Sequence, residues 1–150
     1  MNKPRILVVD DTIDILRTLH LLLAERFEVI LANDGLSGLA KATRYLPDLI
    51  ILDIMMPKMS GYQFFDQCRK YPVLKNVSII FISAKGTPID KDYGLKKGAS
   101  AYITKPFEPR DLLKKIDDLM NENPPEPRER ISYDKVIEEE AKDKKVYWQG

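Results

Sequence analysis

Short apolar runs alternate with amphipathic patterns along most of the 150-residue chain, and this alternation constrains the fold more than any other feature. The runs are rich in β-branched residues and apolar on both faces, which is typical of strands in a parallel sheet that is covered on each side. They predict strands at residues 5–9, 27–32, 48–52, 77–82 and 101–104.

Between these runs, apolar residues recur at three- and four-residue steps, which predicts helices with one buried stripe. The helices are expected at residues 14–26, 35–45, 60–70, 88–98 and 109–121. Ser60 suits a helix N-cap, Pro88 and Pro109 suit a first turn, and Gly98 can adopt the left-handed conformation that ends a helix. The order βαβαβαβαβα predicts an α/β fold: a doubly wound parallel sheet with helices on both faces.

Composition excludes several classes of protein. Lys plus Arg number 24 against 23 Asp plus Glu, so the chain lacks the basic excess expected of a nucleic-acid-binding domain. No apolar run approaches the ~20 residues that span a bilayer, and the first residues do not resemble a signal peptide. A single cysteine, Cys68, excludes an internal disulfide. We therefore expect a cytoplasmic protein that binds neither membrane nor nucleic acid directly.

Polar side chains follow successive apolar runs, and each comes where a strand is predicted to end. They are Asp10 and Asp11, then Asp53, then Ser83, then Lys105. Each residue taken alone is an ordinary turn or capping residue. Ligands of open parallel sheets bind outside the carboxyl ends of the strands. The presence of all these polar residues at that one edge therefore favours a single site. Three converging carboxylates should attract a hard divalent cation such as Mg²⁺.

These residues carry a resemblance to a known family. The chain resembles the receiver domain of two-component response regulators, the CheY-like family, over about residues 4–121. The matching segments are Val8-Val9-Asp10-Asp11, residues 48–57, Gly61, Ile82-Ser83-Ala84, Gly98-Ala99 and residues 102–107. The resemblance implies a flavodoxin-like (βα)5 fold with a five-stranded parallel sheet in strand order 2-1-3-4-5, followed by a C-terminal tail.

The resemblance also implies roles for the site residues. Asp53 matches the phosphoacceptor, whose carboxylate attacks a phosphohistidine. Asp10, Asp11, Asp53 and the backbone carbonyl of Met55 match the ligands of Mg²⁺ or Mn²⁺. Lys105 matches the residue that, with the metal, neutralises charge on the phosphoryl oxygens.

Further positions match the parts of the family that read and remove the phosphoryl group. Ser83 matches the switch hydroxyl and Tyr102 the switch aromatic, which turns inward when Ser83 moves. Lys105-Pro106 matches a cis peptide bond of the family. Met55 and Lys85 match two positions that tune hydrolysis of the phosphoryl group.

The implied function is that of a receiver that takes a phosphoryl group from a sensor histidine kinase or a phosphotransfer protein. The face formed by residues 88–98, 101–104 and 109–121 would then signal to a downstream protein, to an output domain or to a second protomer. Such a chain is not an enzyme in the usual sense, although it assists its own phosphoryl transfer and autodephosphorylation. The alternative is a stand-alone protein-binding or phosphorelay receiver, or the receiver of a hybrid kinase, without an output domain of its own.

Other readings of the same residues fit less well. A phosphatase of the haloacid dehalogenase type needs a second Asp two residues after its nucleophile, where this chain has Thr12. A P-loop enzyme or a dinucleotide-binding domain needs a glycine-rich turn after the first strand, and Asp10-Asp11-Thr12 contains no glycine. An unphosphorylated pseudo-receiver is disfavoured because the key residues are present.

Beyond the receiver at residues 1–121, composition changes. Residues 122–131 form a Pro-rich linker, and residues 132–150 form a charged tail with apolar residues at helical spacing. The tail is too short for a winged-helix domain or a cyclase. We expect a signalling helix within a longer protein that continues past Gly150. A disordered tail and a docking segment for a partner or second protomer are the alternatives.

Overall fold

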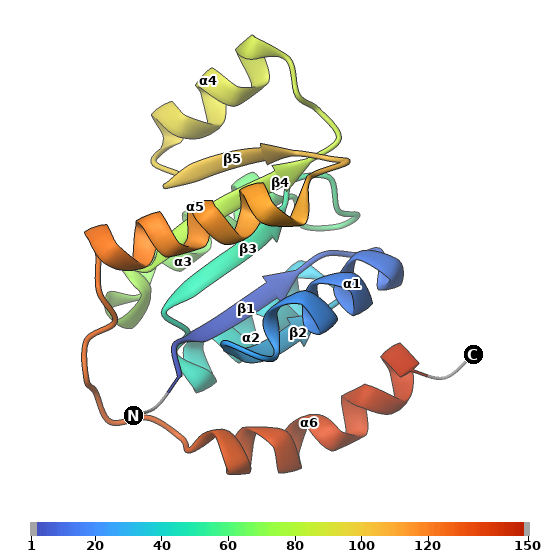
Figure 1. The fold of residues 1–150 in the computed structure, drawn as a ribbon, viewed down its shortest axis with the longest axis vertical. Coiled ribbons are helices and arrows are strands. Elements are labelled where there is room, and N and C mark those ends of the chain that lie inside the picture. The colour runs from blue at the N-terminus through green and yellow to red at the C-terminus, as the bar shows by residue number, and fades with distance from the viewer. Residues whose placement is uncertain (1–2, 149–150) are drawn as a thin grey trace.

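The computed structural model describes residues 3–148, and the side chains among them as far as residue 142. Five strands form one sheet in the order β2-β1-β3-β4-β5, and every neighbouring pair is parallel (Figure 1). The strands are β1 (Arg5–Val9), β2 (Glu28–Ala32), β3 (Leu49–Asp53), β4 (Ser78–Ser83) and β5 (Ala101–Thr104). The predicted fold class and strand order are confirmed.

Helices cover both faces of this sheet. They are α1 (Ile13–Leu23), α2 (Gly35–Tyr45), α3 (Gly61–Lys70), α4 (Pro88–Lys97), α5 (Pro109–Glu122) and α6 (Tyr133–Trp148), with a short 3-10 helix at Pro72–Leu74. Among the described residues, no helix combines the length and apolar character needed to cross a membrane.

Alternation along each strand divides the core into two clusters. In β1, Leu7 and Val9 face the cluster that contains buried residues of α2 and α3, whereas Ile6 and Val8 face the cluster of α1 and α5. All four are fully buried. Burying an aliphatic side chain of this size contributes about 1.5–3 kcal/mol, so the side chains of β1 stabilise the packing of helices on both faces of the sheet.

The helix ends near the site follow the predicted capping residues. Ser60 and Gln63 form a capping box at the start of α3, and Gly98 ends α4 with φ of 121°. Three element ends near the site differ from the sequence analysis. Helix α1 ends at Leu23 rather than residue 26, and β3 and β4 each extend one residue further, so that Asp53 and Ser83 are the last residues of their strands.

The segment after α5 is not a free tail. Helix α5 includes Glu122, the first residue assigned to the linker, and residues 123–132 then run without regular structure to α6. As Figure 1 shows, this segment passes the amino ends of the strands, and α6 lies beyond β2, at the opposite edge of the sheet from α4. The expectation that the chain continues past Gly150 lies outside the described residues.

Candidate phosphoacceptor site

Three carboxylates meet at the carboxyl edge of the sheet, as the sequence predicts. Asp10 and Asp11 directly follow β1, and Asp53 ends the neighbouring strand β3. One carboxylate oxygen from each lies within 4.8 Å of the other two. Asp10 and Asp53 are buried, with exposed fractions of 0% and 3%, whereas Asp11 is exposed. The cluster is therefore closed on the sheet side and open to solvent at Asp11.

Lys105 is the cation of this cluster. Its Nζ lies 2.8 Å from Asp10 Oδ2 and 3.6 Å from Asp53 Oδ1. One ammonium does not balance three carboxylates, which repel one another by about 3 kcal/mol per pair at an effective dielectric near 20. Burial, followed by the charge of Asp10, raises the pKa of Asp53 from 3.8 to about 7, although Lys105 opposes this shift. A hard divalent cation would relieve that repulsion, so the donor set fits Mg²⁺.

Backbone groups hold the carboxylates in place. The N–H of Thr12 donates to Asp10 Oδ1 at 2.8 Å, and the N–H of Met55 donates to Asp53 Oδ1 at 3.2 Å. The Met55 side chain is half exposed beside the site. Gly61, to which the sequence analysis gave no role, is the first residue of α3 and lies against the backbone of Asp53. A Cβ at this position would lie 2.4 Å from the Asp53 carbonyl oxygen, so the close approach requires glycine.

The two residues matched to the switch both bond to the backbone of Lys85. The N–H of Lys85 donates to Ser83 Oγ at 3.1 Å, and the Tyr102 hydroxyl donates to the Lys85 carbonyl oxygen. Ser83 is fully buried, and the Tyr102 ring is half-buried with its centroid 6.3 Å from that of Phe81. Tyr102 thus already lies against the β4–α4 loop while Ser83 bonds to Lys85.

Lys105 is positioned by the backbone around it. Its N–H donates to the Ser83 carbonyl oxygen at 2.8 Å, which ties the end of β5 to the end of β4. The Lys105-Pro106 peptide bond is cis, as expected from the resemblance. The side chain of Lys85 is exposed on the neighbouring loop. Apart from Tyr102, which lies within β5, the residues singled out for the site therefore lie at the carboxyl edge of the sheet or on the loops that border it.

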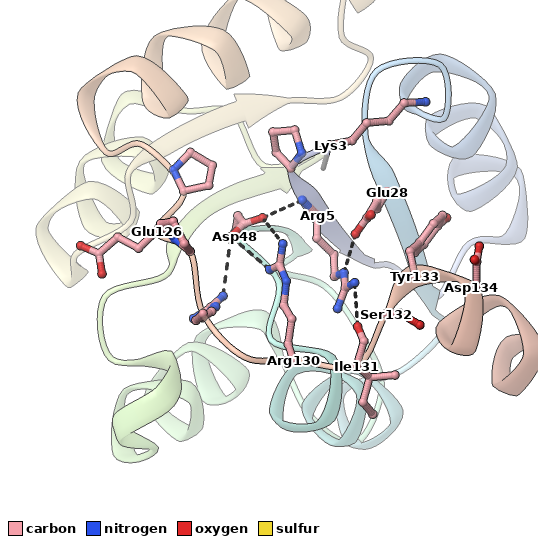
Figure 2. A pocket seen from close by; sticks show the side chains of 14 residues that line it. Lys3, Arg5, Glu28, Asp48, Glu126, Arg130, Ile131, Ser132, Tyr133 and Asp134 are labelled. Atoms are coloured by element: carbon pink, nitrogen blue, oxygen red, sulfur yellow. Dashed lines mark hydrogen bonds and ion pairs between the residues drawn. The ribbon is translucent and has the colours of Figure 1, made fainter. Parts of the chain in front are cut away.

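Sequence reasoning missed a second polar cluster at the opposite, amino edge of the sheet (Figure 2). Arg5 is 2% exposed, and its guanidinium donates to Glu28 and to the carbonyl oxygens of Tyr45 and Ile131. Asp48 accepts the backbone N–H of Arg5 at 2.7 Å. The signal was an arginine within an otherwise apolar strand, since a buried charge needs partners.

Comparison with known proteins agrees with this geometry. The family model of the response regulator receiver domain matches residues 6–117. The DNA-binding response regulator MtrA of Mycolicibacterium paratuberculosis is 36% identical over 87% of this chain and 57% of its own length. Hybrid signal transduction histidine kinase D of Dictyostelium discoideum is 36% identical over 79% of this chain and 8% of its own length. The chain thus spans little more than half the length of the former relative.

Solved structures match the sheet and its helices. Chemotaxis response regulator CheY4 of Vibrio cholerae has a TM-score of 0.74 and 34% identity, and the match covers 79% of this chain and 99% of CheY4. A CheY-like receiver domain protein of Methanospirillum hungatei has the same TM-score and identity, with 81% and 96% covered. About a fifth of this chain therefore has no counterpart in either structure. On its sequence, its fold and these comparisons, the chain belongs to the family of response regulator receiver domains.

Proposed function

We propose that the chain receives a phosphoryl group on Asp53 from a phosphohistidine of a sensor kinase or phosphotransfer protein. The observation that carries this proposal is the buried Asp53 carboxylate with Lys105 and two further carboxylates around it. A carboxylate oxygen of Asp53 attacks phosphorus, the N–P bond to the imidazole breaks, and an O–P bond forms in line with it. The imidazole leaves with the bonding electron pair and takes up a proton.

Asp10, Asp11, Asp53 and the backbone carbonyl of Met55 would hold Mg²⁺ or Mn²⁺. When bound, the ion supplies positive charge next to the phosphoryl oxygens. Lys105 Nζ lies between Asp10 and Asp53, where it can neutralise a phosphoryl oxygen on Asp53. Hydrolysis of the acyl phosphate, which restores Asp53, would be the remaining chemistry of the site, and Met55 and Lys85, whose side chains are exposed on the bordering loops, would alter the access of water.

Phosphorylation would be read through Ser83 and Tyr102. If the Ser83 hydroxyl turns to a phosphoryl oxygen, it loses its hydrogen bond from the N–H of Lys85. The carbonyl oxygen of Lys85 accepts the hydroxyl of Tyr102, so a shift of Lys85 would also move Tyr102. The change would therefore reach β5 and α4. Helix α4 exposes Ile89 at 81% and Tyr93 at 54%, a partly apolar surface suited to a protein partner.

The partner of this surface follows from the kind of protein to which the receiver belongs. MtrA is by name a DNA-binding response regulator, and the Dictyostelium relative is a hybrid histidine kinase. We propose an output module or a downstream protein as the partner of the α4–β5–α5 face, with a homodimer through this face or a phosphorelay receiver as the alternatives. We place the chain in the cytoplasm, together with the kinase domain that would supply it.

The test is phosphorylation by acetyl phosphate, followed by intact mass spectrometry. The wild-type chain should gain one phosphoryl group in Mg²⁺ and none in EDTA. Asp53→Asn should gain none, while Asp118→Asn, which changes a half-exposed carboxylate on α5 that pairs with Lys114, should behave as wild type. Labelling of Asp53→Asn, or no labelling of the wild-type chain in Mg²⁺, would refute the assignment.

A further inference from the structure

Side chains occupy the outer edge of β2, the first strand of the sheet order. The Tyr133 hydroxyl accepts the N–H of Val29 at 3.1 Å and donates to the carbonyl oxygen of Val29 at 2.9 Å. Lys41 Nζ donates to the carbonyl oxygen of Leu31 at 2.7 Å. The backbone N–H and C=O groups of an edge strand are normally available for pairing with another strand. Here side chains of α6 and α2 bond to these groups, so the edge of β2 is closed.

Helix α6 is held on α2 by charge. Glu139 bonds to the Arg44 guanidinium and accepts the Tyr45 hydroxyl at 2.7 Å. Glu140 lies 2.8 Å from Lys41 Nζ, and both of these side chains are largely buried. These pairs place carboxylates of α6 directly on basic residues of α2.

Apolar contact adds to these ion pairs. Val136 is 1% exposed and joins the core cluster on the α2–α3 face of the sheet, and Ile131 and Tyr133 pack against the same cluster. Fully burying one valine contributes about 1.5–3 kcal/mol. Helix α6 is thus an integral part of the fold.

The linker before α6 is also bonded to the receiver. Arg130 donates to both carboxylate oxygens of Asp48 (Figure 2) and to the Leu46 carbonyl oxygen. Arg128 donates to the carbonyl oxygens of Leu46 and Pro47. A cavity of about 820 Å³ remains between this linker and the amino ends of the strands. Residues 124–142 thus form one continuous element, which we call the clasp.

The sequence of β2 itself offers little protection against pairing. Its residues, Glu-Val-Ile-Leu-Ala, include no proline and no lysine, and its single charge is already paired with Arg5. Two such strands pairing antiparallel about a two-fold axis would place Ile30 opposite Ile30 and Glu28 opposite Ala32. No like charges would face each other in this register.

We propose that the clasp, together with Lys41 of α2, closes the β2 edge against a second copy of this chain, and that release of the clasp, which takes Glu140 away from Lys41, lets two copies pair through β2. The clasp lies along β2 and the amino edge of the sheet, whereas Asp53 lies at the carboxyl edge. The proposal is therefore independent of phosphoryl transfer at Asp53.

Two variants release the clasp by different chemistry. Glu139→Lys with Glu140→Lys reverses the charges that face α2, and Val136→Asp puts a charge into the apolar contact. The matched control, Asp134→Lys with Glu138→Lys, makes the same change of net charge on two exposed residues of α6. Circular dichroism and a thermal melt would verify that each variant retains the receiver fold.

Hydrogen exchange and sedimentation equilibrium then test the edge. In the wild-type chain and the control, the Val29 amide should be protected and the protein monomeric. Both release variants should form dimers as concentration rises, and dilution to monomer should remove protection at Val29. Release variants that stay monomeric at every concentration, or whose Val29 amide stays protected in the monomer, would overturn the proposal. A wild-type chain that dimerises through β2 would overturn it as well.

Discussion

Replacing Asp53 by asparagine should stabilise the metal-free protein, by an amount that grows with pH. Burial and the nearby Asp10 raise the pKa of Asp53 to about 7, against 3.8 for an unperturbed carboxyl group. A carboxyl group whose folded-state pKa is raised costs no stability below its unfolded pKa and its full cost above its folded pKa. At about 1.36 kcal/mol per pH unit, a rise from 3.8 to about 7 corresponds to about 4 kcal/mol at pH 8.

Asparagine removes this cost with little change of shape. Its side-chain oxygen can still accept the N–H of Met55, which lies 3.2 Å from the aspartate oxygen. We therefore expect Asp53→Asn to gain about 2–4 kcal/mol in the free energy of unfolding at pH 8 and almost nothing at pH 4. Asp11→Asn should gain less, because Asp11 is exposed.

Urea unfolding in EDTA, followed by circular dichroism from pH 4 to pH 8, measures this difference. Saturating Mg²⁺ should stabilise the wild-type chain more than the variant and so narrow the gap at pH 8, because the ion neutralises the carboxylate that the variant lacks. A gap that does not change with pH, or a variant less stable than the wild-type chain at pH 8, would refute the reasoning that the charge on Asp53 destabilises the protein when no metal is bound in EDTA.

Three further predictions concern the scaffold. Burial raises the pKa of the Cys68 thiol to about 12, so a disulfide reagent at pH 8 should modify it only as the protein unfolds, and fast modification of the folded protein would contradict this. Gly61→Ala should cost about 1–3 kcal/mol in urea unfolding, since a Cβ would lie 2.4 Å from the Asp53 carbonyl oxygen, whereas an unchanged midpoint would show that α3 moves freely. The Arg44 guanidinium and the Tyr45 hydroxyl lower the pKa of Glu139 from 4.5 to about 2. The stability that this carboxylate provides should therefore be complete above pH 4.5 and lost as pH falls toward 2, and Glu139→Gln should flatten that part of the thermal stability curve; an identical acid dependence in the two proteins would argue against the contact.

The sheet could be predicted because its signals are local. Each strand is a short apolar run, and the residues after it decide where it ends, so Asp10, Asp53, Ser83 and Lys105 could be placed at one edge before any coordinates were known. What local pattern could not provide is distance. The 3.6 Å between Lys105 Nζ and Asp53, and the shared bonds of Ser83 and Tyr102 to Lys85, depend on how β3, β4 and β5 pack.

The clasp shows a different limit. The bond from Arg5 to the Ile131 carbonyl joins residues 126 positions apart, and that from Lys41 to Glu140 joins residues 99 apart. The hydrophobic periodicity of the tail does not indicate such long-range contacts. The charged residues of the tail gave no sign of these pairs, because local pattern does not distinguish carboxylates that face water from carboxylates that face a lysine.

A search for partners of the buried charges would have pointed to the clasp. Arg5 lies in a strand that is apolar on both sides, so this cation was due to be buried in the predicted fold, and the structure shows that Lys41 on α2 is buried as well. Buried cations require anionic or carbonyl partners, and few segments of the chain were left without a place in that fold. The linker and the charged tail were among them. Matching a buried charge with a segment that has no place in the fold therefore predicts long-range contacts that hydrophobic periodicity cannot, and in this chain it leads from Arg5 to the linker, where the Ile131 carbonyl accepts its guanidinium.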